Sequence, residues 1–118
     1  MIETQTFFGY ELKKGYDPSP LNYIWLEFNC NAEEHYKRFS YNELKNSLFT
    51  SFIIYCRKRY AMSPFLYKDM SLDIFITFVN RYISNDENYD LLLNAIITKK
   101  VDTFFNKFID YIAMYFMS

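Results

Sequence analysis

The chain has 118 residues, 51% of them hydrophobic and 23% charged, and a formal net charge of −1. This length supports one domain around one hydrophobic core, so we expect a single helical domain over residues 1–118. The composition is too apolar for a disordered chain, and no uncharged stretch approaches the roughly 20 apolar residues that cross a bilayer, so we expect no membrane partner.

The first 39 residues carry the weakest pattern. We expect residues 1–16 to be irregular or to form one edge strand. No basic flank precedes an apolar run there, so we expect no secretory signal and a cytoplasmic protein. Ser19 and Pro20 match a helix cap followed by a first-turn proline. The apolar spacing that follows favours a helix, with a strand as the alternative; its residues are Leu21, Ile24, Trp25 and Phe28. Asn31 with Glu34 predicts a short helix to Phe39.

The strongest helix pattern covers residues 41–61. Ser40 and Glu43 have the spacing of a capping box, in which each side chain bonds a backbone N–H of the other residue. One apolar stripe follows, made of Leu44, Leu48, Phe52 and Tyr55. The polar residues opposite it are Asn42, Asn46, Thr50 and Arg57. The sequence therefore predicts an amphipathic helix from Tyr41 to about Ala61.

Further helix starts follow at regular intervals. Ser63 and Pro64 predict a short turn through Met70. A helix is predicted from Ser71 to Ser84. Its buried face should comprise Leu72, Phe75, Val79 and Tyr82, and its exposed face Asp73, Thr77, Asn80 and Ser84. Because the polar face is narrow, we expect this helix to lie centrally in the bundle. Asn85 with two acids after it should cap a helix that carries Tyr89, Leu92, Leu93, Ile96 and Ile97 and ends near Lys99 and Lys100.

The last helix is predicted from Val101 almost to the C-terminus. Its apolar stripe comprises Val101, Phe104, Phe105, Phe108, Tyr111, Ile112, Tyr115 and Phe116. Glycine occurs only at Gly9 and Gly15, so the turns after Gly15 must use other residues. The sequence as a whole predicts an all-α fold, one irregular bundle of five or six helices.

Motifs that carry catalysis or cofactor binding are missing. Without glycine after Gly15, the chain has no phosphate-binding loop, no dinucleotide fingerprint and no G-x-S-x-G nucleophile elbow. A structural zinc site needs four ligands, whereas Cys30, His35 and Cys56 are the Cys and His residues present. We read both cysteines as reduced and buried. We therefore expect no catalytic, cofactor or metal site; a His35 base beside Cys30 is the alternative.

Asp86, Asn88 and Asp90 resemble the first ligand positions of a calcium loop. Leu91 then replaces the turn glycine and Ile97 the bidentate glutamate, so a capped helix start with an acidic first turn explains these residues better.

Aromatic residues make up 22% of the chain, with 12 Tyr and 13 Phe. A tyrosine buries a large ring and keeps a polar tip, so this excess suits a surface that a partner covers, and we expect some of these rings at the surface. The alternative is an AT-rich genome, whose codons favour Phe and Tyr.

Charge is segmented along the chain. Residues 1–40 carry six acids and four bases, residues 41–68 one acid and five bases, and residues 69–118 seven acids and four bases, which gives −2, +4 and −3. The basic run Arg57, Lys58 and Arg59, flanked by Tyr55 and Tyr60, has the composition of a nucleic-acid contact. It equally suits the negative end of a helix dipole, and we favour that interpretation because nucleic-acid binders are usually basic overall.

The acidic candidates for a partner surface are Asp69, Asp73, Asp86, Glu87 and Asp90. With Tyr82 and Tyr89 near them, they would form the small acidic face that neutralises a basic partner, such as a nuclease toxin. An ordinary solvated face is the alternative.

Small size, a sequence pI of about 5.8, aromatic excess and missing catalytic motifs together resemble the small immunity proteins of bacterial contact-dependent toxin systems. The resemblance covers the character of the whole chain and no motif, so no functional residue is carried over. It implies a cognate toxin, one-to-one binding, and inhibition by covering an active site or by blocking a contact that the toxin requires. The alternative is a phage or viral accessory protein that binds a host factor or nucleic acid through the basic run.

Overall fold

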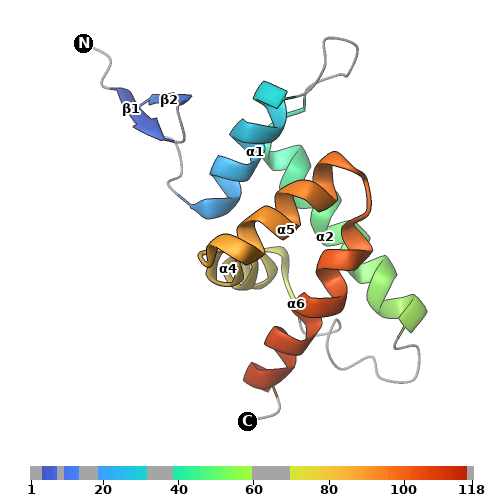
Figure 1. Ribbon diagram of the computed structural model, residues 1–118. Coiled ribbons are helices and arrows are strands. Elements are labelled where there is room, and N and C mark those ends of the chain that lie inside the picture. The colour runs from blue at the N-terminus through green and yellow to red at the C-terminus, as the bar shows by residue number, and fades with distance from the viewer. Residues whose placement is uncertain (1–3, 8–9, 14–18, 32–38, 60–69, 117–118) are drawn as a thin grey trace.

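The computed structural model describes residues 4–7, 10–13, 19–31, 39–59 and 70–116. Five helices lie in these ranges: α1 (Pro20–Asn31), α2 (Tyr41–Arg59), α4 (Leu72–Tyr82), α5 (Asp86–Ile97) and α6 (Val101–Phe116). They form one bundle, which confirms the all-α prediction (Figure 1). The short elements expected at residues 31–39 and 63–70 fall almost wholly outside the described residues.

The N-terminal residues form a hairpin instead of an irregular segment or a single edge strand. Strand β1 (Thr4–Phe7) pairs antiparallel with β2 (Tyr10–Lys13), with Thr4 opposite Lys13 and Phe7 opposite Tyr10. Figure 1 shows this hairpin set apart from the helices, on the N-terminal side of α1. Each strand pairs with the other alone, so both are edge strands whose alternate backbone N–H and C=O groups face away from the ladder.

Helix α1 begins at Pro20, as predicted, and the strand alternative is excluded. The Ser19 hydroxyl accepts from the Asn22 N–H at 3.3 Å, as an N-cap does. The Leu21 N–H donates to Oδ1 of Asn80 on α4 at 3.0 Å. Asn80 was expected to face solvent and is instead half-buried, because the start of α1 packs over this part of α4 and needs an acceptor there.

Helices α2 and α5 start at the predicted caps, and Ser71, predicted as the first residue of a helix, is the N-cap of α4. Oxygens of Ser40, Ser71 and Asn85 accept from backbone N–H groups in the first turn of α2, α4 and α5. Along α2, the predicted stripe is buried at all four positions, which are Leu44, Leu48, Phe52 and Tyr55. The last two residues of the predicted 41–61 helix lie outside the described part of the chain.

The turn from α5 to α6 is built without glycine. The Lys99 N–H donates to the Ile96 carbonyl at 3.2 Å and the Lys100 N–H to the Ala95 carbonyl at 2.8 Å. These two bonds define a Schellman motif, which requires a left-handed residue after the C-cap. Lys99 takes that conformation with φ of 59°. A lysine therefore occupies a position that usually favours glycine or asparagine.

Aromatic rings fill the centre of the bundle. Phe52 of α2, Phe75 of α4 and Phe108 of α6 are fully buried, with ring centroids 5.0 to 5.8 Å apart. Phe104 and Phe105 of α6 extend the cluster. Helix α4 packs against α1, α2 and α6, and α1, α2 and α6 each pack against three helices as well.

Where side chains are described, the aromatic residues pack in the interior of the bundle and do not form an exposed surface. Every Phe, Tyr and Trp side chain in that part of the chain is buried or half-buried. The large exposed apolar side chains there are aliphatic, namely Ile54, Ile74, Ile97 and Met114. The expectation of surface rings is wrong for these residues, because rings from all five described helices pack in one shared core. Among the described helices, none is both long enough and apolar enough to span a membrane.

Candidate functional site

The residues expected on the acidic face separate into two groups. Asp73 is exposed in the first turn of α4, whereas Asp86, Glu87 and Asp90 are exposed in the first half of α5. Nine residues of helix separate Asp73 from Tyr82 at the other end of α4, about 14 Å at 1.5 Å per residue. Asp69 lies outside the described residues. The predicted single face is therefore reduced to the start of α5.

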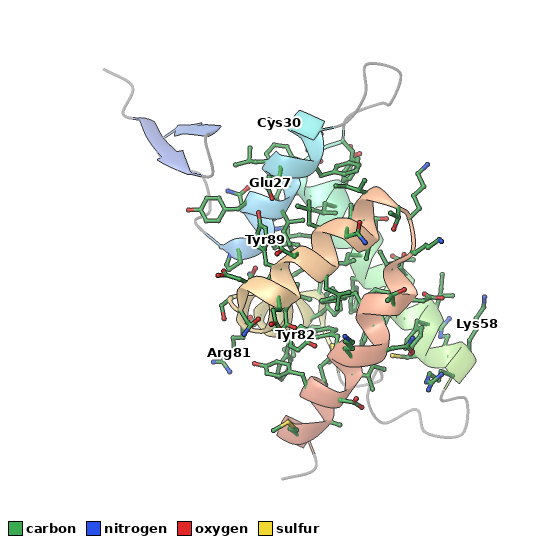
Figure 2. All side chains as sticks on the ribbon, in the orientation of Figure 1. Glu27, Cys30, Lys58, Arg81, Tyr82 and Tyr89 are labelled. Atoms are coloured by element: carbon green, nitrogen blue, oxygen red, sulfur yellow. The ribbon has the colours of Figure 1, made fainter. Side chains whose placement is uncertain are left out.

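A fourth carboxylate joins this group from α1. The Tyr89 hydroxyl donates to Oε2 of Glu27 at 2.7 Å, and Figure 2 shows the two side chains meeting between α1 and α5. We call the set Glu27, Asp86, Glu87 and Asp90 the acidic corner. Exposed Arg81 lies at the end of α4 close to the start of α5. The corner thus combines four carboxylates with one guanidinium nearby.

The start of α5 is held rigidly. The Asn85 side chain accepts from the N–H groups of Glu87 and Asn88 at 2.9 and 3.3 Å, and the Asn88 amide donates to the Tyr82 carbonyl at 2.9 Å. These bonds fix the α4–α5 turn and leave the acidic side chains exposed. Asp86 and Glu87 also lie at the positive end of the helix dipole, which stabilises their charge.

The two tyrosines of the predicted face pack beneath the acidic corner instead of exposing their rings to solvent. Tyr89 is 8% exposed. Tyr82 is half-buried and packs on Phe104, Phe108 and Tyr111 at 5.7, 5.5 and 5.0 Å. Burial raises the pKa of the Tyr82 phenol, and the negative charge of Asp110 raises it further. Periodicity placed both residues on apolar stripes, while the acidic-face hypothesis placed them near a partner; the packing of α6 over Tyr82 and of α1 over Tyr89 encloses them.

The basic run forms a separate surface at the far end of α2. Arg57, Lys58 and Arg59 are all exposed, and Lys58 lies on the opposite side of the molecule from Arg81 and Tyr82 in Figure 2. Tyr55, expected to flank the run as a stacking ring, is buried against Phe105 and donates to the Asn106 side chain. The predicted pairing of cations with aromatics is therefore wrong on this side; Tyr60 is not among the described residues.

The cysteines differ in environment. Cys30 is exposed at the end of α1, contrary to the expectation that both are buried, while Cys56 is buried in α2. Burial raises the pKa of the Cys56 thiol to about 12, which keeps it protonated and unreactive. Both thiols are free. Within the described ranges no cluster of three or more Cys, His, Asp or Glu is arranged to hold a metal ion. His35 is not among the described residues.

Sequence reasoning identified the acids of α5 and missed Glu27 and Arg81. The α5 acids were recognisable because they follow a helix cap in the sequence. Glu27 belongs to the corner only through the packing of α1 on α5, a contact between residues 62 positions apart. Comparisons with family models, curated proteins and solved structures found no match for this chain.

Proposed function

We propose that this protein is a non-catalytic protein-binding module, an immunity protein that neutralises a cognate toxin by direct one-to-one binding in the cytoplasm. The observation that carries the proposal is the acidic corner: three exposed carboxylates on the capped start of α5, with Glu27 held beside them. A rigid patch with an excess of negative charge, here four carboxylates near one guanidinium, accelerates and orients the encounter with a basic partner.

The charge distribution of the bundle supports this assignment. The acidic corner and the basic end of α2 lie far apart (Figure 2). A basic partner can therefore bind the corner without electrostatic repulsion from Arg57, Lys58 and Arg59. A toxin that acts on nucleic acid carries a positive substrate-binding surface, and a carboxylate patch that covers it competes directly with phosphate groups.

The first test is co-expression with the product of the neighbouring upstream gene. Wild-type protein should co-purify with that product at one-to-one stoichiometry and should restore growth to cells that express it. The absence of both a complex and protection would refute the proposed function.

The second test locates the binding surface. In the corner variant, Asp86→Asn, Glu87→Gln and Asp90→Asn are combined; the control combines Glu43→Gln and Asp102→Asn. The control removes two exposed acids from first helical turns and so matches the loss of helix-dipole stabilisation expected for Asp86 and Glu87; Asp90 lies in the second turn of α5. We expect the corner variant to bind at least tenfold more weakly, mainly through a slower association rate, while the control binds like wild type. Equal affinities of the corner variant and the control for the toxin would exclude the acidic corner as the binding surface.

The exposed basic run favours one second candidate, a nucleic-acid-binding accessory protein. Its signature is binding to single strands that weakens steeply between 50 and 200 mM salt, by about tenfold or more for a few phosphate contacts. Changing Arg57, Lys58 and Arg59 to glutamine should then abolish the binding measured by fluorescence anisotropy. Wild-type protein that leaves labelled strands unbound at 50 mM salt eliminates this candidate.

A further inference from the structure

The β1–β2 hairpin has two sheet edges that no described strand covers. The two strands pair only with each other within the described residues, and Figure 1 shows the hairpin set apart from the helices. A two-stranded hairpin alone is marginally stable in water, whereas three or more strands with an apolar face form a stable sheet. Another strand that pairs with one of these edges would therefore stabilise the hairpin.

The register of the hairpin determines which residues of β2 direct their backbone groups outward. Phe7 pairs with Tyr10 across two intervening residues, a spacing at which the two form a hydrogen-bonded pair. Hydrogen-bonded and non-hydrogen-bonded pairs alternate along an antiparallel ladder, so Tyr10 and Leu12 direct their N–H and C=O groups to β1. Glu11 and Lys13 direct theirs away from β1. The free edge of β2 thus offers the backbone groups of Glu11 and Lys13 to another strand.

A second copy of β2 matches this edge in one register. In an antiparallel pair related by a twofold axis, outward residues pair with outward residues. Glu11 opposite Glu11 of the second copy, or Lys13 opposite Lys13, places like charges directly across the ladder, which destabilises a sheet. Glu11 opposite Lys13 instead repeats twice about the axis, and both pairs combine opposite charges.

The same register joins the apolar faces of the two hairpins. Residues alternate between the faces of a sheet, so Phe7, Tyr10 and Leu12 share one face, and Glu11 and Lys13 share the other. When Glu11 lies opposite Lys13, Leu12 lies opposite Leu12 of the second copy. The apolar face then continues across the junction of a four-stranded sheet, which is the condition for stability that one hairpin does not meet.

From the free edge, the charge-matched register and the continuous apolar face, we propose that two copies of this chain associate through their β2 edges. The β1 edge directs Thr4 and Thr6 outward and carries no charge that would select a register. The acidic corner belongs to α1 and α5 and takes no part in this pairing. Each copy in the dimer therefore keeps its own corner, and the proposed one-to-one binding of a toxin is unaffected.

Sedimentation velocity of the full chain between about 5 and 500 µM tests the association, and we expect the sedimentation coefficient to rise from a monomer value to a dimer value. Glu11→Lys and Lys13→Glu each place like charges opposite one another, so each should weaken dimerisation by about tenfold or more. The double variant exchanges the two charges, keeps both pairs matched, and should dimerise like wild type. Glu43→Lys, at an exposed position of α2, is the control and should not change dimerisation. A chain that stays monomeric up to about 500 µM, or a double variant as weak as the single variants, overturns the proposal.

Disulfide cross-linking tests the register itself. Leu12 would lie opposite its own copy in a non-hydrogen-bonded pair, where Cα atoms are about 4.5 Å apart, a separation that a disulfide can span. In a Cys30→Ser background, which removes the exposed native thiol, Leu12→Cys should give a covalent dimer on incubation with oxidised glutathione. Thr6→Cys should not, because β1 lies at the outer edge of the four-stranded sheet. Equal dimer yields from the two cysteine variants would exclude the register and the proposal with it.

Discussion

Removal of the Asn80 side chain is the sharpest test of how the bundle is joined. The Asn80 Oδ1 is the acceptor for the Leu21 N–H, in a first turn where Pro20 has no N–H and Ser19 caps Asn22. Leu21 is fully buried, so Asn80→Ala leaves its N–H without an acceptor. An unsatisfied buried donor costs about 1–3 kcal/mol, and alanine returns roughly 0.5 kcal/mol of helix propensity. We expect a net loss of about 1–2 kcal/mol.

Urea denaturation followed by circular dichroism measures this loss. The midpoint should fall while the slope of the transition stays constant, and the melting temperature should drop by about 4 °C per kcal/mol for a domain of this size. Asn46→Ala on the exposed face of α2 is the matched control, since it changes helix propensity alone. Asn80→Asp keeps the acceptor and should lie near wild type. A stability of Asn80→Ala equal to that of Asn46→Ala would contradict the role given to this bond.

Four further predictions follow from the core, the α5–α6 turn and the thiols. Phe52→Ala should destabilise by about 3–5 kcal/mol in the same assay, because its fully buried ring touches α4 and α6 rings; a loss below about 1 kcal/mol would exclude that packing. Lys99→Gly should raise stability by about 0.5–1 kcal/mol by relieving the left-handed backbone, and a decrease would show that the turn needs the side chain. In native protein, a thiol reagent should modify Cys30 quickly and Cys56 only on unfolding. The raised pKa of Cys56 stabilises the fold fully below pH 9, where the unfolded thiol is also protonated, and this contribution should be lost as pH rises from 9 towards 12; Cys56→Ala should flatten that slope.

Local signals in the sequence were sufficient for most helix boundaries. Ser40 and Asn85 were recognisable as caps because a cap acts on N–H groups two or three residues away. The stripe of α2 was recognisable because every fourth or third residue of a helix returns to the same face. These effects depend on neighbours in the chain, so the sequence by itself determined the helices and the side that each one buries.

The sequence did not predict in the same way whether the aromatic residues are buried or exposed. Periodicity places Phe75, Tyr82 and Phe108 on inner faces, but which helices enclose each ring depends on how the helices pack. The packing of α6 against α4 encloses Tyr82, and the packing of α1 against α5 encloses Tyr89. The aromatic residues whose number suggested a contact surface therefore pack in the core, where their side chains are described.

Composition and spacing determined on their own that this chain is one helical bundle with acids at the start of a capped helix. Only the tertiary structure decided that Glu27 joins those acids and that Asn80 caps a helix 59 residues earlier. The physical reason is range: capping and periodicity act over a few residues, whereas these two features require helices that are distant in the chain to pack at one particular angle.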